Sequence, residues 1–187
     1  FSVLDFATET LIGQTEGNSQ NYGAASPTAA RAIGYDPIRN EGIYFYEYIN
    51  PAAPHYLGQT PAGVEPEADC PRRVTISPDG RRAVITNVLS GNAVLLNLET
   101  LAVEATFPIS PRPQDVAITS DSRWAVVCAM ENNEVDIIDL EAGAIVASVP
   151  TNTRPSLLSI LPDDSRAMVA TIQGNTVSVV RLAGAAS

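Results

Sequence analysis

Short apolar runs recur at a constant interval along the second half of the chain, and polar turns separate them. Three prolines that lie 42 residues apart open the repeats: Pro71, Pro113 and Pro155. Each repeat has three apolar runs in the same register, and the third run ends at a leucine: Leu98, Leu140 or Leu182. Runs of this length, joined by turns rich in Gly, Asn and Asp, indicate β-strands.

The interval itself predicts the fold class. Self-similarity with a period in the low forties, built from short β-runs, is typical of the blades of a β-propeller. We therefore expect an all-β chain in which residues 1–187 form a single β-propeller unit with four-stranded blades of about 42 residues. Complete blades are predicted over 71–107 and 113–149, and an incomplete blade with three strands is predicted over 155–182.

One polar residue recurs with the apolar runs. An aspartate occupies the turn after the first run of each repeat: Asp79, Asp121 and Asp163. The side chain of a turn aspartate bonds to its own backbone two residues on, which favours a structural role for all three.

The first 70 residues follow the repeat only loosely. Residues 1–15 parallel the third and fourth strands of a later blade and are interpreted as the end of a blade, whereas 16–29 has the Gly, Asn and Ser content of a surface loop. An irregular blade is predicted over 30–60, without a recognisable third strand. Its candidate first, second and outer strands are 30–35, 43–48 and 56–60.

Two segments of the regular region carry the motif of a known repeat. The first is Val-Thr-Ile-Ser-Pro-Asp-Gly-Arg-Arg at 74–82, followed by Ile-Thr-Asn at 85–87, and the second is Val-Asp-Ile-Ile-Asp-Leu at 135–140. They resemble the YVTN-type repeat of bacterial and archaeal β-propellers. That resemblance implies a seven-bladed ring, and the family includes surface-layer proteins, periplasmic binding and assembly proteins, lactonase-like enzymes and dehydrogenase subunits.

The chain length departs from such a ring, because 187 residues hold between four and five repeats of 42. A partial propeller, or open arc, leaves sheet faces of Val, Ile, Leu and Ala in water and leaves strand edges unpaired, and both favour association. We expect the arc to be completed by chain absent from this sequence, by a second copy or by another protein. The expected partner is therefore a protein, or the chain itself through self-association.

Charge excludes two classes of partner. All 11 positive charges are arginines, since the sequence has no lysine, and 21 carboxylates bring the net charge to −10. Nucleic acids and anionic membrane surfaces are bound through clustered Lys and Arg, so neither is expected as a partner. No apolar run approaches the length that crosses a bilayer, and membrane insertion is not expected either.

The sequence offers little catalytic chemistry. His55 is the only histidine, which excludes a three-histidine metal site within the chain, and its place beside Pro54 favours a loop or strand-edge role over that of a general base. The absence of lysine removes Schiff-base chemistry. No catalytic residue, metal site or cofactor is predicted. Cys70 and Cys128 have neither metal-binding nor redox spacing, and either free thiols or a disulfide fits them.

Two arginines at equivalent positions of the repeat are candidates for binding. Arg112 and Arg154 each precede the proline that opens a blade, where the chain of a propeller passes toward the central channel. Together they could present a positive rim to a carboxylate or phosphate. The alternative is that they pair with neighbouring carboxylates such as Asp115. Cys70 takes the same position in the preceding blade, which argues against a continuous ring of arginines.

Trp124 is the third candidate for partner binding. It is the only tryptophan, and it replaces an arginine that stands at the equivalent position of the other two repeats, Arg82 and Arg166. An exposed tryptophan is a plausible contact anchor, because tryptophan is enriched among the residues that dominate interfaces. Burial under a loop is the alternative.

These observations favour a non-catalytic binding or scaffold module that mediates protein–protein interaction. The family resemblance further implies an extracytoplasmic location, in the periplasm, on the cell surface or secreted, in a bacterium or archaeon. The alternative is a lactonase-like hydrolase, or the propeller subunit of a periplasmic dehydrogenase, with its site at the central channel. An enzyme should show converging carboxylates near the axis, whereas a binding module should show a large apolar surface.

Overall fold

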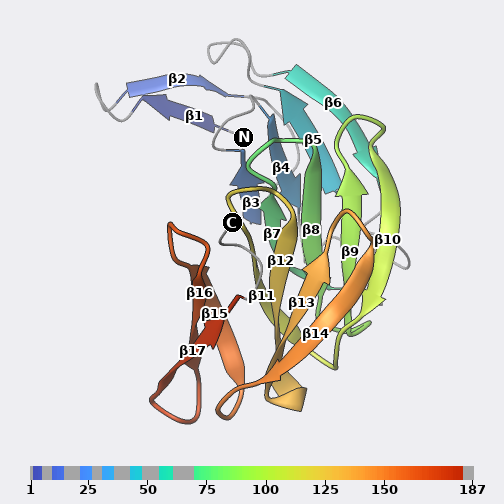
Figure 1. Ribbon diagram of the computed structural model, residues 1–187. Coiled ribbons are helices and arrows are strands. Elements are labelled where there is room, and N and C mark those ends of the chain that lie inside the picture. The colour runs from blue at the N-terminus through green and yellow to red at the C-terminus, as the bar shows by residue number, and fades with distance from the viewer. Residues whose placement is uncertain are drawn as a thin grey trace.

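The computed structural model describes residues 2–5, 10–14, 22–26, 31–35, 43–47, 55–60 and 70–182. Within them the chain forms antiparallel β-strands, apart from one short 3-10 helix, η1 (Met130–Asn132) (Figure 1). Each sheet is a meander, in which strands that follow one another along the chain are hydrogen-bonded neighbours. The expected fold class, an all-β partial β-propeller with four-stranded sheets, is confirmed.

Two sheets lie in the N-terminal part of the chain. The first is a hairpin of β1 (Ser2–Asp5) and β2 (Thr10–Gln14). The second has four strands: β3 (Tyr22–Ala25), β4 (Arg31–Tyr35), β5 (Ile43–Glu47) and β6 (His55–Thr60). His55 therefore begins the outer strand of its sheet, where it is the register partner of Glu47.

The structure corrects the strands predicted for this second sheet. The loop predicted over 16–29 is wrong in part, because β3 lies within it and is the first strand of the sheet. As a result β4 and β5 are the second and third strands instead of the first and second. The sequence of β3, Tyr-Gly-Ala-Ala, has little strand preference of its own, and its pairing with β4 makes it a strand.

Three sheets repeat regularly after residue 70, and the third has one strand fewer than the others. The first comprises β7 (Pro71–Ile76), β8 (Arg82–Asn87), β9 (Asn92–Asn97) and β10 (Ala102–Pro108). The second comprises β11 (Pro113–Ile118), β12 (Trp124–Ala129), β13 (Glu134–Asp139) and β14 (Ala144–Pro150). The third comprises β15 (Pro155–Ile160), β16 (Arg166–Thr171) and β17 (Val177–Arg181).

The turn between the first and second strands is the same in all three regular sheets. One turn position has a positive φ in each: 71° at Gly80, 63° at Ser122 and 54° at Asp164. The preceding aspartate accepts a hydrogen bond of 3.0 Å from the backbone N–H two residues on, which belongs to Arg81, Arg123 or Ser165. The structural role predicted for Asp79, Asp121 and Asp163 is confirmed.

The described residues form three hydrophobic clusters, each between two neighbouring sheets. Successive side chains of a strand point to opposite faces, so a strand of an inner sheet contributes to two clusters. In β8, Ile85 packs toward the preceding sheet, with Ile33 and Phe45, while Val84 packs toward the following sheet, with Val127. The third cluster joins the sheet β11–β14 to β15–β17. Each sheet is therefore stabilised mainly by its neighbours on either side.

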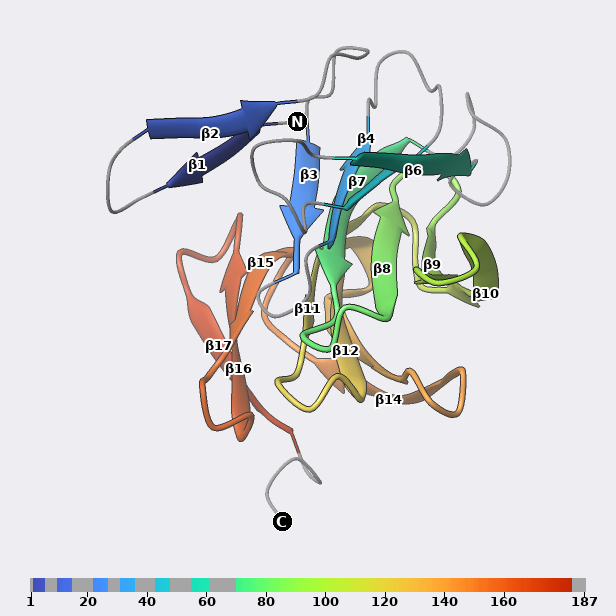
Figure 2. The ribbon, with the colours of Figure 1, turned by 90° about the horizontal axis from the view of Figure 1, so that it is seen from above.

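The sheets follow one another around an arc with their first strands inside. Strands β3, β7, β11 and β15 are neighbours, whereas β6, β10 and β14 lie on the outside (Figure 1). Figure 2 shows the sheet β15–β17 at one end of the arc and the β1–β2 hairpin at the other. The outward face and the outer edge of β15–β17 therefore have no neighbouring sheet among the described residues, and these two surfaces are central to the candidate site.

Candidate functional site

One position at the entry to each regular sheet has a left-handed backbone conformation. The value of φ is 47° at Cys70, 65° at Arg112 and 58° at Arg154. The backbone of this position bonds to the turn after the second strand: the carbonyl of Cys70 accepts from the N–H of Val88 at 3.0 Å, and that of Arg154 accepts from Ile172 at 3.1 Å. The three residues thus share a left-handed backbone conformation, and Cys70 and Arg154 also share the same backbone hydrogen bond; neither feature depends on a particular side chain.

The side chains of the two predicted rim arginines differ in their contacts. Arg154 Nη2 lies 2.9 Å from Glu131 Oε1, so this guanidinium is paired with a carboxylate, as the alternative interpretation expects. Arg112 is exposed, and among residues 70–182 it forms no ion pair. No described contact joins the two arginines. Their role as an anion-binding rim therefore stays a prediction.

Asp115, the carboxylate expected beside these arginines, pairs elsewhere. Its Oδ1 lies 3.0 Å from Arg73 Nε in the preceding sheet, and its Oδ2 accepts a 2.9 Å bond from the N–H of Leu158 in the following sheet. Asp115 is 4% exposed. A buried carboxylate is costly unless it is paired and hydrogen-bonded, and here both conditions are met. Asp115 therefore joins three successive first strands, and its carboxylate is fully engaged.

The outward face of the last sheet carries exposed apolar side chains. We call this surface the open face, and it is formed by Leu157, Met168, Val177 and Val179, which are 61%, 36%, 56% and 55% exposed. The residues 42 and 84 positions before the last three lie in the contacts between sheets, where five of the six are buried and Ile137 is partly buried. They are Val84 and Val126, Ala93 and Val135, and Leu95 and Ile137. The open face is thus the repeat's sheet-contact face, and no sheet among the described residues covers it.

A groove of about 310 Å³ runs beside the outer edge of the same sheet. We call it the β17 groove, and it is lined by Trp124, Ile137, Val146, Ala147, Val149, Arg181 and Leu182. Ile137, Val149 and Leu182 also belong to the cluster that packs β11–β14 against β15–β17. The groove therefore continues an existing contact between two sheets into solvent.

Trp124 stands in the wall of this groove and is partly exposed, so it is not buried under a loop. The guanidinium carbon of Arg123 lies 4.8 Å from the centre of the Trp124 ring, at the distance of a cation–π contact. Arg123 is in turn 3.5 Å from Asp139. These contacts hold the indole at the groove. A role for Trp124 as a contact anchor stays a prediction.

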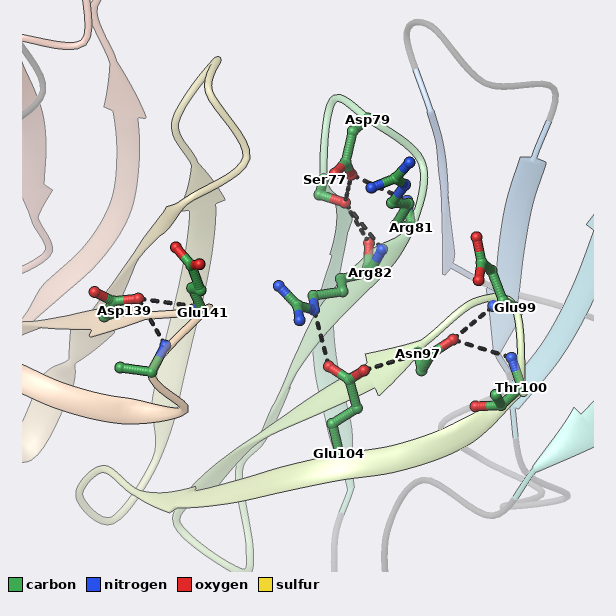
Figure 3. A network of polar contacts seen from close by, with 11 residues as sticks. Ser77, Asp79, Arg81, Arg82, Asn97, Glu99, Thr100, Glu104, Asp139 and Glu141 are labelled. Carbon is green, nitrogen blue, oxygen red and sulfur yellow. Dashed lines mark hydrogen bonds and ion pairs between the residues drawn. The ribbon is translucent and has the colours of Figure 1, made fainter.

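A polar network crosses the outer end of the sheet β7–β10 (Figure 3). Glu104 of β10 accepts from Arg82 Nε of β8 at 2.9 Å and from Asn97 Nδ2 of β9 at 2.7 Å. One carboxylate on the fourth strand thereby ties together the second and third strands. In the last sheet the equivalents of Arg82 and Asn97 are Arg166 and Arg181, which are both exposed.

The described residues contain little that suggests catalysis. They hold no group of three or more His, Cys, Asp or Glu side chains placed to bind a metal ion. Cys70 and Cys128 are both free thiols, which settles the choice left open by their spacing. Burial, together with the charge of Asp115, raises the pKa of the Cys128 thiol far above neutral pH. No helix in the described part of the chain is long and apolar enough to cross a membrane.

Sequence reasoning identified Trp124 and expected an exposed apolar sheet face and an unpaired strand edge, but it did not locate these surfaces. The open face and the arginines at 166 and 181 carry no motif, so composition and spacing alone give them no function. The 42-residue repeat did contain a signal for the open face. It aligns Met168 with Val126 and Val179 with Ile137, and so identifies Met168 and Val179 as positions that contact a neighbouring sheet. Only the structure shows that those contacts are made in one sheet and open in the next.

No protein-family model and no curated protein matches this sequence. Solved structures do resemble it. The hydrazine synthase of Kuenenia stuttgartiensis matches with a TM-score of 0.74 and 16% identity over 97% of this chain and 64% of its own. The dihydro-heme d1 dehydrogenase NirN matches with a TM-score of 0.75 and 20% identity over 99% of this chain and 39% of its own.

A third similar structure is the periplasmic gluconolactonase PpgL of Pseudomonas aeruginosa. It matches with a TM-score of 0.68 and 19% identity, over 90% of this chain and 51% of its own. The chain thus spans between 39% and 64% of the length of these three chains. Identities this low establish a shared fold, and the arc of sheets described above is a propeller-type architecture that these proteins also contain.

Proposed function

We propose that this chain is a non-catalytic, YVTN-like propeller module that binds protein through the open face of its last sheet. One observation carries the proposal. Positions that are 0% exposed at Val84, Val126, Ala93 and Val135 become 36% exposed at Met168 and 56% exposed at Val177. An apolar surface of this kind on an otherwise regular repeat is typical of a contact site.

The chemistry of the open face defines what binds to it. In the two complete contacts the covering sheet presents small and β-branched side chains, such as Ala125 and Val127 or Ala167 and Val169. Fully burying one Val, Leu or Met side chain contributes about 1.5–3 kcal/mol. Several such side chains buried together can hold a second sheet without any specific polar contact.

A second copy of the chain is the occupant that we propose for this face. Every pair of neighbouring sheets is packed by the same repeat, so the chain encodes both sides of the contact. The net charge of −10 opposes association of two copies, because like charges repel. Salt screens this repulsion, and self-association should therefore strengthen between low and physiological ionic strength.

Sedimentation equilibrium over a range of concentrations tests this proposal. The weight-average mass should rise above the 19.8 kDa of the monomer, and Leu157→Glu or Met168→Glu should return it to the monomer value. Leu89 is 66% exposed and lies outside the open face, so Leu89→Glu is the matched control and should leave association unchanged. A monomer at every concentration and salt level would contradict self-association.

The predicted binding residues can be tested in the same system. Arg112 and Arg154 would bind an anionic group of the partner, and Trp124 would provide an apolar anchor. The double variant Arg112→Ala, Arg154→Ala should weaken association, and the loss should be largest at low salt, because removing two positive charges increases the repulsion between copies. Unchanged association would discard the rim. Because Arg154 pairs with Glu131, Arg112→Ala alone should carry most of the effect.

A second candidate is an enzyme, either a lactonase-like hydrolase or the propeller subunit of a dehydrogenase. The resemblance to a gluconolactonase and to a dihydro-heme d1 dehydrogenase supports it. Asp115 joins three inner strands, so in an enzyme it would hold these strands in position and would not contact the substrate. The test is hydrolysis of gluconolactone by the chain, compared with Asp115→Asn. Activity that is lost in a folded variant would favour the enzyme over the binding module.

An extracytoplasmic location also belongs to this proposal. It is supported by the YVTN-like motif at 74–82 and by the resemblance to a protein described as periplasmic. Antibodies against the chain, applied to fractions of the source cells, test the location. Recovery in the cytoplasmic fraction would contradict it.

A further inference from the structure

Strand β17 lacks the neighbour that its equivalents have. In the sheet β7–β10, β9 pairs with β10, and in the sheet β11–β14, β13 pairs with β14 over six register partners from Glu134 and Pro150 to Asp139 and Ala144. Among the described residues β17 pairs with β16 alone. Within the described part of the chain its outer edge therefore presents backbone groups that no strand pairs, and such groups can accept another strand.

The β17 groove lies where a strand added to this edge would place its side chains. In the complete sheet Ile145 of β14 is the register partner of Ile138 and packs into the cluster toward the preceding sheet. The equivalent of Ile138 in the last sheet is Val180, which is buried toward β11–β14. Side chains of register partners lie on the same face, so the residue opposite Val180 would enter the groove.

Charge at this edge indicates what the added strand carries. Arg166 and Arg181 are register partners on β16 and β17, and like charges that face each other across strands are destabilising. In the sheet β7–β10 the residue equivalent to Arg166 is Arg82, and it is paired with Glu104 of the fourth strand. A carboxylate at the position of Glu104 would lie between Arg166 and Arg181 and relieve their repulsion.

In the sheet β11–β14 the same two positions also match each other, but both residues are apolar instead of charged. Trp124 replaces the arginine there, and the residue equivalent to Glu104 is the apolar Val146. Trp124 and Val146 lie in the same groove wall. The first residue of the second strand and the third residue of the fourth strand therefore match each other in both complete sheets. By this rule we expect an acidic residue at the third position of a strand that pairs with β17, where it would face Arg166.

We propose that the β17 edge and the β17 groove bind an extended acidic segment of a partner protein by strand addition. The segment lies antiparallel to Val177–Arg181, inserts an apolar side chain opposite Val180 into the groove, and places a carboxylate between Arg166 and Arg181. This inference rests on the proposed function and names the second surface through which the module would bind protein.

Two synthetic peptides taken from this chain are the probes. The first has the sequence of residues 100–109, which contains β10 with its Glu104, and the second has the sequence of residues 142–151, which contains β14 with Val146 at the same place. Fluorescence anisotropy should show binding of the first peptide to the whole chain. The second peptide, or the first with Glu104→Gln, should bind about tenfold more weakly, because a charge-assisted pair is lost.

A double-mutant cycle identifies the proposed contact. Arg166→Gln, Arg181→Gln in the chain should weaken binding of the Glu104 peptide and remove its advantage over the Gln variant. An equal loss with both peptides would show that the arginines do not recognise the carboxylate and would overturn the proposed recognition. Gln173 is exposed and provides the control: Gln173→Ala should leave the affinity for both peptides unchanged.

Crossed variants separate this proposal from the proposed function. Ala147→Phe fills the groove and should abolish peptide binding while self-association through the open face is retained. Leu157→Glu should abolish self-association while peptide binding is retained, since Leu157 lies on β15, two strands away from the edge. If both variants abolish both activities together, the two surfaces are not separate and this inference fails.

Hydrogen exchange tests whether the edge is open. The amides of β17 that do not pair with β16 should exchange quickly in the chain alone and become protected when the Glu104 peptide is added. Protection before any peptide is added would show that the chain itself, or a second copy, already covers the edge. That result would overturn binding of a partner segment at this place. Sedimentation at the same concentration would distinguish the two sources.

Discussion

The carboxylate of Asp164 accepts three hydrogen bonds from Ser120 in the neighbouring sheet. The N–H of Ser120 lies 3.1 Å from Oδ1 and 2.9 Å from Oδ2, and its hydroxyl lies 2.5 Å from Oδ2. Asp164 is 7% exposed. The preceding pair of sheets has a related contact, in which the N–H of Asp79 donates to Ser122 Oγ at 3.0 Å. Turn-to-turn bonds of this kind fix how adjacent sheets are placed.

Asp164→Ala should lower the free energy of unfolding by about 1–3 kcal/mol, because it removes a charged acceptor of three hydrogen bonds from Ser120. Asp164→Asn should cost less, since an amide oxygen still accepts and asparagine tolerates the positive φ of 54° at this position. Urea unfolding measures both values. Gln173→Ala is the surface control, and an Asp164→Ala variant as stable as this control would contradict the role of the contact.

Acid should weaken the turn that follows β13. Backbone N–H groups of Ala142 and Glu141 bond to Asp139, and with Arg123 they lower the pKa of this carboxyl. A carboxyl with a lowered pKa stabilises the fold above its ordinary value of 3.8, and this contribution is lost as the pH falls below that value. Asp139→Asn should therefore unfold with a weaker pH dependence below about pH 4. Parallel curves for the two proteins in acid would contradict this.

Asp136 should have the opposite pH dependence. Burial raises the pKa of this carboxyl, the bond from Ser148 partly offsets the increase, and the nearby charge of Glu134 adds to it. A raised pKa means that stability is greatest below the ordinary value of 3.8 and is lost as the pH rises through the higher value of the folded state. The free energy of unfolding of Asp136→Asn, compared with that of the native chain, should therefore be most favourable near neutral pH. Unfolding at pH 3 and pH 7 tests the sign.

Only one of the two thiols should react in the folded chain. Cys128 is 0% exposed, and burial raises its pKa, so almost no thiolate forms near neutral pH. Cys70 is only partly buried. Titration with a disulfide reagent should modify Cys70 quickly and Cys128 only after denaturation. In Cys70→Ser the fast reaction should disappear, and a fast reaction that survives there would contradict the burial of Cys128.

The regular sheets could be predicted well from the sequence, because the 42-residue repeat is recognisable from the residues of each repeat alone. Prolines at 71, 113 and 155 each begin a strand, and the turn aspartates behave as local chemistry predicts. Strand β3 was not recognisable, because Tyr-Gly-Ala-Ala becomes a strand only through its neighbour β4. Local signals therefore predicted hairpins and missed the strand that depends on tertiary pairing.

The candidate site was less accessible to sequence reasoning for a related reason. Arg154 is predicted from its position, and Asp115 is expected only as a carboxylate beside the arginines. Their actual partners, Glu131 and Arg73, come from other elements of the fold. The open face of Met168 and Val179 has the same residue types as the buried faces before it. Whether such a face is covered depends on the presence of a neighbouring sheet. The pattern of residues within the strand does not show whether that sheet is there.

The left-handed entry position at Cys70, Arg112 and Arg154 fixes the course of the backbone without requiring one type of side chain. A thiol and two guanidinium groups already occupy it in a single chain. A substitution at one of these positions changes the charge beside the inner strand of a single sheet. It costs the fold little, provided that the new residue tolerates a positive φ. New binding chemistry can therefore evolve at these positions while the architecture beneath them stays the same.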